Sequence, residues 1–154
     1  FEGLALNDIV IERGSLSQLI GLAIRCDRKL VSEVKADGLI IASPTGSTAY
    51  NLAAGGPILH PDVKSLVVTP IAAHALTSRP LIFPDDSKLT FKLIGKSELN
   101  KDRAHFVVDG MKIDQLSADD ELVVRRSQSD HWMVRDPNQN DFTLLREKLK
   151  FGDR

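Results

Sequence analysis

The segment from residue 37 to residue 57 carries the residue types in this sequence that are best suited to chemistry. It reads DGLIIASPTGSTAYNLAAGGP, so an apolar run leads into a turn of small polar residues and then into an Ala-rich stretch that contains Tyr50. Amide N–H and hydroxyl groups beside an aromatic ring suit a ribose, a phosphate or a stacked base. Small polar residues also favour ordinary turns, so the spacing alone equally allows a simple strand–turn–helix connector.

Local signals predict how this segment folds. Residues 39–42 are apolar and predict a buried strand. A short helix is expected to begin near Ala49, capped by the hydroxyl of Ser47 or Thr48, and to end at residues 55–57, which are Gly-Gly-Pro. A helix of about two turns is costly to nucleate and buries little surface. Its polar groups are therefore candidates for ligand binding.

Familiar catalytic and metal motifs are absent from the sequence. The histidines lack the spacing of a metal pair, and neither His-Glu-x-x-His nor Cys-x-x-Cys occurs, so no metal site is predicted. Ser47 lies in TGSTA and not in Gly-x-Ser-x-Gly, which argues against a hydrolase elbow. A nucleotide would bind here without a P-loop or a Gly-x-Gly-x-x-Gly fingerprint. The histidines are His60, His74, His105 and His131.

Charge and composition argue against several classes of partner. The 20 basic and 21 acidic side chains leave a net charge of -1, and the basic residues are dispersed. Nucleic-acid binding needs a concentrated positive surface, so no nucleic-acid partner is expected. The lone Cys26 gives no disulfide framework, which fits a reducing compartment. No apolar run reaches the roughly 18 residues of a membrane span, so no membrane partner is expected.

Most of the remaining chain predicts strands. Residues 89–93 alternate apolar and polar side chains, the pattern of a strand with one buried face. Asp109-Gly110 between two apolar runs predicts a tight hairpin. Residues 122–124 and 132–134 predict a further pair of strands. Many short strands and only one or two short helices favour a mainly β fold, an antiparallel β-sandwich.

The last helical signal lies near the carboxy terminus. Phe142, Leu145 and Leu149 fall on one helical face, and Asp141 is placed to cap the helix. We expect a helix over about 141–150 that covers an edge of a sheet and has a structural role.

Several motifs resemble those of the carboxy-terminal domain of the NAD kinases, and they occur along the chain in the same order as in that family. They are residues 37–57, His60-Pro61-Asp62, Thr69-Pro70-Ile71, Ser78-Arg79-Pro80-Leu81, Asn7-Asp8 and Val108-Asp109-Gly110. The resemblance implies one NAD-binding β-sandwich domain over residues 1–154. It also implies a separate amino-terminal α/β domain that carries the Gly-Gly-Asp-Gly motif with the catalytic aspartate. That motif does not occur here, so the resemblance implies a fragment that is inactive alone and contains no catalytic residue.

The resemblance also implies which residues bind NAD. Asn7 and Asp8 match positions that bind the ribose, although the residues alone favour an Asx turn there. Asp37, which could also be only a turn residue, and Ala72 match contacts made across a subunit interface, with Lys35 nearby as a partner for a phosphate or carboxylate. Arg79 is expected to brace its loop, with contact to a phosphate as the alternative, and Met111 replaces a glutamine common in the family. The segment that matches the substrate contacts comprises Thr48, Ala49, Tyr50, Asn51, Leu52 and Ala53.

The activity that the resemblance implies is phosphoryl transfer from ATP, or from polyphosphate, to the adenosine 2′-hydroxyl of NAD, giving NADP. Mg2+ or another divalent metal would arrive with ATP, and no tightly bound cofactor is expected. A homodimer or homotetramer in the cytoplasm is expected as well. Two alternatives belong to other classes: a fragment of a related lipid or sphingoid kinase, and a non-catalytic nucleotide-binding domain that acts as a sensor or scaffold.

Overall fold

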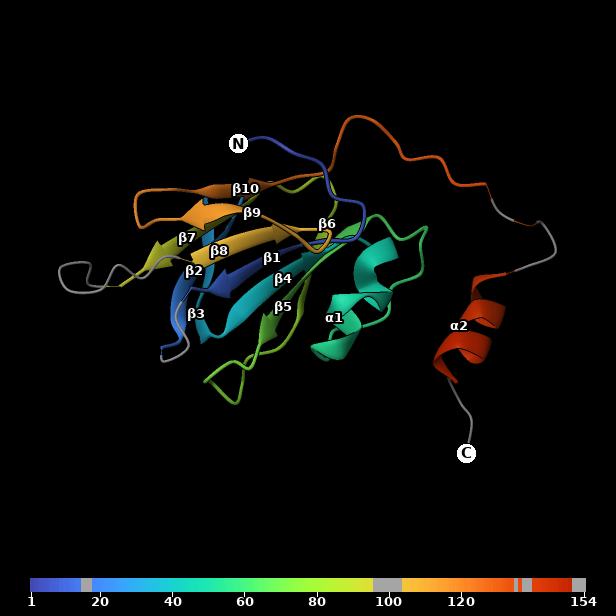
Figure 1. Ribbon diagram of the computed structural model, residues 1–154, viewed down its shortest axis with the longest axis horizontal. Coiled ribbons are helices and arrows are strands. Elements are labelled where there is room, and N and C mark those ends of the chain that lie inside the picture. Colours follow the sequence, from blue (N-terminus) through green and yellow to red (C-terminus); the bar gives the residue numbers. More distant parts are fainter. Residues whose placement is uncertain (15–17, 96–103, 135, 137–139, 151–154) are drawn as a thin grey trace.

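Two antiparallel sheets form the body of the protein in the computed structural model (Figure 1). The structure describes residues 1–14, 18–95, 104–134, 136 and 140–150. The strands are β1 (Asp8–Arg13), β2 (Ile20–Cys26), β3 (Lys29–Ala36), β4 (Gly38–Ala42), β5 (Ser65–Ile71), β6 (Leu81–Pro84), β7 (Leu89–Ile94), β8 (Ala104–Val108), β9 (Met111–Leu116) and β10 (Leu122–Val124). The helices are a 3-10 turn over Thr45–Thr48, α1 (Tyr50–Ala53) and α2 (Asp141–Leu149).

The order of the strands confirms the expected sandwich. The six-stranded sheet runs β6-β5-β4-β1-β8-β9, and the four-stranded sheet runs β10-β7-β2-β3. Each of these pairings is antiparallel. Chain neighbours β3 and β4 belong to different sheets, so the backbone passes from one layer to the other at Asp37. The predicted hairpin at Asp109-Gly110 joins β8 to β9.

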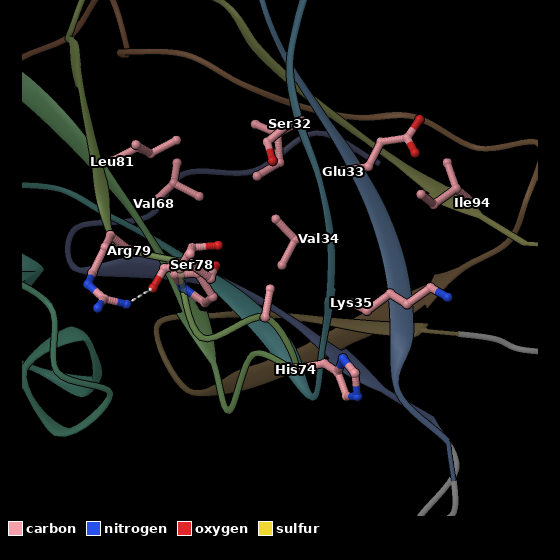
Figure 2. A pocket seen from close by; sticks show the side chains of 14 residues that line it. Ser32, Glu33, Val34, Lys35, Val68, His74, Ser78, Arg79, Leu81 and Ile94 are labelled. Carbon is pink, nitrogen blue, oxygen red and sulfur yellow. Dashed lines mark hydrogen bonds between the residues drawn. The ribbon is translucent and has the colours of Figure 1, made fainter.

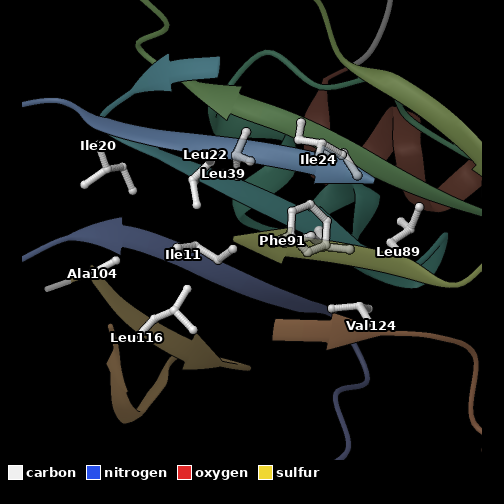
Figure 3. Packing of buried hydrophobic residues seen from close by; sticks show 12 residues of the cluster. Ile11, Ile20, Leu22, Ile24, Leu39, Leu89, Phe91, Ala104, Leu116 and Val124 are labelled. Carbon is white, nitrogen blue, oxygen red and sulfur yellow. The ribbon is translucent and has the colours of Figure 1, made fainter. Parts of the chain in front are cut away.

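The core lies between the two sheets (Figure 3). Ile11 and Leu39 of the six-stranded sheet meet Leu22, Leu89 and Phe91 of the four-stranded sheet, and each of these residues is 0% exposed. Full burial of such a side chain contributes about 1.5–3 kcal/mol. The apolar runs of the sequence therefore account for the layered fold, and the sheets give the site below a rigid frame.

The predicted strand at residues 132–134 was wrong. β10 pairs with β7, with Leu122 opposite Phe91, and residues 131–134 join no strand. Trp132 is 89% exposed, and after β10 the chain leaves the sandwich (Figure 1). A short apolar run forms a strand only where a sheet edge receives it, and local sequence does not reveal that edge.

The carboxy-terminal helix was predicted correctly, but its cap and its position were not. Asn140 caps α2, because its side-chain oxygen accepts a hydrogen bond of 2.8 Å from the Thr143 N–H. Asp141 instead lies 3.8 Å from His60, whose ring also contacts Phe142. The helix therefore meets the loop after α1 and lies away from the sheet edges (Figure 1). No helix in the described part of the chain is long and apolar enough to cross a membrane.

Candidate functional site

The start of β1 forms a corner with the β8–β9 hairpin. The Asp109 carboxylate accepts hydrogen bonds from the backbone N–H groups of Leu6 (2.7 Å), Asn7 (2.8 Å) and Asp8 (3.1 Å). The Asp109 N–H donates in return to the Asp8 carbonyl at 3.0 Å. Four hydrogen bonds thus join residues that are separated in the sequence by 101 to 103 positions.

The turn after β4 holds the same corner from the other side. The Ser43 hydroxyl donates to the Leu6 carbonyl at 2.6 Å, and the Ser43 N–H donates to the Asn7 carbonyl at 2.9 Å. Gly46 packs so closely that an added Cβ would lie 2.0 Å from the Asn7 carbonyl oxygen. Only glycine fits there, which gives the Thr-Gly-Ser-Thr turn a packing role.

The side chains of Asn7 and Asp8 line a cavity of about 350 Å³. Among the described residues, neither side chain forms a hydrogen bond with the protein, so the expected alternative of an Asx turn is not seen. Tyr50 is 47% exposed at the cavity. The cavity therefore offers an amide, a carboxylate and an aromatic ring to a ligand. Its lining residues are Asn7, Asp8, Val10, Glu12, Ala49, Tyr50, Val107, Asp109 and Gly110.

The two aspartates of this corner differ in their acidity. Burial raises the pKa of Asp8, and the negative charge of Asp109 raises it further. Burial by itself would raise the pKa of Asp109, but hydrogen bonds from three backbone N–H groups outweigh it and lower the pKa. Asp109 is therefore the carboxylate that the protein stabilises as an anion, and Asp8 is the one left to interact with a ligand.

The helical part of the site is shorter than expected, and its cap was predicted wrongly. The 3-10 turn at Thr45–Thr48 precedes α1, which has four residues, and neither element has a side-chain cap. The Ser47 hydroxyl instead donates to the Pro44 carbonyl at 2.6 Å and accepts from the Leu59 N–H at 3.0 Å. Ser47 is 0% exposed, so it ties the turn to the loop that follows α1.

Asn51 lies beneath this surface. Its side-chain nitrogen donates to the carbonyls of Ser47 (2.9 Å) and Pro57 (3.0 Å), and its oxygen accepts from the Thr69 hydroxyl (2.7 Å). Asn51 is 0% exposed. Its amide is thus committed to the interior, while its neighbours on the same segment face outward: Thr48, Ala49, Tyr50 and Ala53 are exposed, and Leu52 is half-buried.

The remaining expected NAD contacts lie at the opposite end of β4. Asp37 directly precedes this strand and Ser43 follows it. At about 3.4 Å per residue, five residues of strand separate the two ends by roughly 17 Å. Lys35 and Ala72 lie at the Asp37 end: the Asp37 N–H bonds the Ile71 carbonyl, and the His74 N–H bonds the Lys35 carbonyl. One chain therefore does not bring all of the expected contacts together.

Asp37 already has a partner in its own chain. Its carboxylate lies 3.3 Å from the Arg13 guanidinium, and its carbonyl accepts from the Arg13 N–H at 3.0 Å. The residue is not simply a turn, because it connects β3, β4 and the end of β1 at the point where the chain changes sheets.

A larger cavity of about 520 Å³ lies beside this second group, between β3 and the 72–80 loop (Figure 2). Ser32 and Val34 project from one side of β3, while Glu33 and Lys35 project from the other. Arg79 braces the loop as expected, because it donates to the carbonyls of Leu76 (2.6 Å) and Ser78 (2.7 Å).

Sequence reasoning missed Asp109 as a site residue and identified it only as part of a turn. The signal was present, however. In an antiparallel pair, the residue after one strand lies beside the residue before the other, and Ile9 pairs with Val108. Correct pairing of β1 with β8 would have placed Asp109 beside Asp8, but no local pattern specifies a partner so distant in the chain.

Comparison with known sequences shows the family of this chain. Residues 6–135 match the model of a family described as the ATP-NAD kinase C-terminal domain. The chain is 66% identical over 150 residues to the NAD kinase of Bdellovibrio bacteriovorus, and the aligned residues cover 97% of this chain and 48% of that protein. It is 40% identical over 151 residues to the NAD kinase of Koribacter versatilis, which covers 97% of this chain and 51% of that protein.

Solved structures show the same fold. Yeast NADH kinase complexed with NADH superimposes with a TM-score of 0.89 and 31% identity over 97% of this chain and 45% of that one. An NAD kinase from Archaeoglobus fulgidus in complex with ATP gives a TM-score of 0.70 and 28% identity over 81% of this chain and 46% of that one. The sandwich is thus the carboxy-terminal fold of dinucleotide kinases. The chain belongs to the ATP-NAD kinase C-terminal domain family. It spans about half the length of the curated relatives it matches.

Proposed function

We propose that this domain binds NAD and, in the full-length protein, holds its adenosine 2′-hydroxyl for phosphorylation by ATP or polyphosphate, giving NADP. One observation carries the proposal. The Asn7 and Asp8 side chains have no hydrogen-bond partner among the described residues, and they share a cavity with Tyr50. The similarity to a yeast enzyme solved with NADH supports a dinucleotide as the ligand.

The chemistry of the three side chains fits a nucleoside. The Asp8 carboxylate accepts hydrogen bonds from ribose hydroxyls, and the Asn7 amide donates and accepts beside it. The Tyr50 ring offers a face on which a base stacks. Ala49 lines the same cavity, and its small side chain permits close approach. Together these groups orient a hydroxyl, which is the main contribution a protein makes to phosphoryl transfer.

A second copy of the chain completes the site in this proposal. Lys35, Asp37 and Ala72 lie roughly 17 Å along β4 from the Asn7 corner, too far to contact the same part of one ligand. A homodimer or homotetramer that places the Asp37 end of one copy beside the Tyr50 end of another brings them together. The exposed Lys35 ammonium then meets a phosphate of NAD.

The donor half of the reaction is assigned to residues outside this sequence. The matched relatives are about twice as long as this chain, and no Gly-Gly-Asp occurs in it. Mg2+ or another divalent metal enters with ATP. No group of three His, Cys, Asp or Glu side chains within the described ranges fits a metal ion, so no step of the reaction is assigned to metal ligands in this domain. The lone Cys26 supports a cytoplasmic location.

A calorimetric titration of the chain with NAD+ tests the proposal. Tyr50→Ala is expected to weaken binding by about 5-fold to 150-fold, because a stacked aromatic contributes about 1–3 kcal/mol per base. Trp132→Ala removes a more exposed ring far along the chain and serves as the matched control, with unchanged affinity expected. The proposal fails if the unmodified chain does not bind NAD+, or if both variants bind equally well.

A further inference from the structure

We infer that Asp109 is a positioning residue for NAD binding, which fixes the backbone of residues 6–8 so that the Asn7 and Asp8 side chains face the cavity. The inference rests on the proposed function, since it assigns to Asp109 a task in that site. Asp109 need not touch the ligand to perform this task, because it acts through the two residues that do.

Within the described residues, Asp109 and Ser43 form the hydrogen bonds that hold the backbone of residues 6–8. Asp109 accepts from the N–H groups of Leu6, Asn7 and Asp8 and donates to the Asp8 carbonyl. Ser43 donates to the carbonyls of Leu6 and Asn7. All three N–H groups and all three carbonyls of residues 6–8 therefore have a partner in Asp109 or Ser43. The main chain is fixed while the Asn7 and Asp8 side chains stay available, which is the arrangement expected of a preorganised binding site.

The hairpin places the carboxylate by its geometry. Asp109 and Gly110 have positive φ angles of 46° and 80°, as a two-residue turn between antiparallel strands requires. Aspartate tolerates this conformation better than most residues with a side chain. Because Ile9 pairs with Val108, the turn lies directly beside the residues that precede β1. The carboxylate thus meets three consecutive N–H groups, a concave arrangement that favours an anion.

A neutral side chain cannot replace this carboxylate fully. Asparagine has one oxygen acceptor, whereas Asp109 uses both of its oxygens, Oδ2 toward Leu6 and Oδ1 toward Asn7 and Asp8. The NH2 group of the asparagine would face a backbone N–H donor and repel it. Asp109→Asn keeps the size of the side chain, weakens these hydrogen bonds and removes the negative charge beside Asp8. Exchange at the N–H groups of residues 6–8 therefore reports on the hydrogen bonds, apart from the packing of the hairpin.

The test measures amide hydrogen exchange by NMR without ligand and NAD+ affinity by calorimetry, on the unmodified chain and on Asp109→Asn. The matched control is Asp120→Asn, since the Asp120 carboxylate also accepts from a backbone N–H, that of Ser117 at 2.9 Å, in a turn away from the cavity. For Asp109→Asn, exchange at Leu6, Asn7 and Asp8 is expected to rise, and affinity to fall, by about tenfold each. Asp120→Asn is expected to change neither.

Each outcome decides a different part of the inference. Unchanged exchange at residues 6–8 in Asp109→Asn would show that the Asp109 carboxylate does not fix this backbone, and it overturns the inference. Faster exchange with unchanged affinity shows a purely structural role and overturns the role in binding. If the unmodified chain does not bind NAD+, both the proposed function and the role of Asp109 in binding fail. The exchange data still show whether Asp109 fixes the backbone of residues 6–8. Should Asp109→Asn not fold, Asp109→Glu decides: it keeps the charge and moves the carboxylate by one methylene relative to the three N–H groups, and unchanged exchange at residues 6–8 or unchanged affinity overturns the inference.

Discussion

The Thr69 hydroxyl donates a 2.7 Å hydrogen bond to the side-chain oxygen of Asn51, and both residues are 0% exposed. This bond connects α1, which carries Tyr50, to β5 of the six-stranded sheet. A helix of four residues has little stability of its own. Its position under the candidate site therefore depends on this buried polar contact.

Asn51→Ala is expected to destabilise the chain by about 2–4 kcal/mol, because it leaves the Thr69 hydroxyl and the carbonyls of Ser47 and Pro57 without this partner. Urea unfolding measures the change. Tyr50→Ala on the same helix is the control, with a change expected within about 0.5 kcal/mol since the residue is exposed. Equal destabilisation by the two variants would contradict the structural role of Asn51.

Asp8→Asn is expected to stabilise the fold at pH 7 and to weaken NAD+ binding. Because burial and then the charge of Asp109 raise the pKa of Asp8 in the folded protein, the stabilising contribution of this group is present at low pH and is lost as the pH rises through the raised pKa. The asparagine side chain of the variant does not ionise, so this loss of stability does not occur. The variant also lacks the charged hydrogen-bond acceptor that Asp8 offers to the ligand. Urea unfolding at pH 7 and calorimetry check the two effects, and a less stable variant would refute the electrostatic account.

Asp109→Asn is expected to destabilise the chain at pH 7 and to leave its stability unchanged in strong acid. The pKa of Asp109 is lowered by its backbone hydrogen bonds, so its contribution is present above the pKa of the unfolded chain and is lost as the pH falls through the folded-state pKa. At pH 7 the loss should be about 1 kcal/mol, since the residue is exposed. Unfolding curves over a pH series measure it, and a pH-independent difference would contradict this prediction.

Mixing two defective variants is expected to restore NAD+ binding. If Tyr50 of one copy and Lys35 of another share a site, an oligomer of Tyr50→Ala chains with Lys35→Ala chains contains one site with both defects and one with neither. In a 1:1 mixture of dimers, about a quarter of the sites are then intact. Titration of the mixture, refolded together, measures them. Mixing two samples of Tyr50→Ala is the control, and no gain over the separate variants would mean that each chain binds alone.

Local patterns were sufficient to predict the fold class and most of the strands. The alternation at residues 89–93, the Asp-Gly turn and the apolar run at 39–42 each report on one element, and the structure forms all three. Ser47 and Asn51 were harder to place, because a polar residue in a turn looks the same whether its partner is solvent, a ligand or the interior. The structure shows that both are buried, because Asn51 bonds Thr69 of β5 and Ser47 bonds Leu59 in the loop after α1.

Two further features depended on contacts distant in the chain. Residues 132–134 have the composition of a strand but pair with no strand in the part of the chain that the structure describes. The role of Asp109 requires the pairing of β1 with β8, which no short window of sequence specifies. The resemblance to a family supplied candidate ligand contacts, whereas the structure shows which of them line one cavity and which lie at the far end of β4.

The span of the Leu6–Asp109 contact bears on the order in which the protein acquires its site. The two residues are 103 positions apart, and contacts of such separation form late because a long loop must close first. During synthesis the Asn7 corner leaves the ribosome long before the hairpin that secures it. We therefore expect a nascent chain to form the pairing of β2 with β3 early and to gain competence for NAD only when β8 is released, so that ligand can protect the finished protein but not assist its first steps of folding.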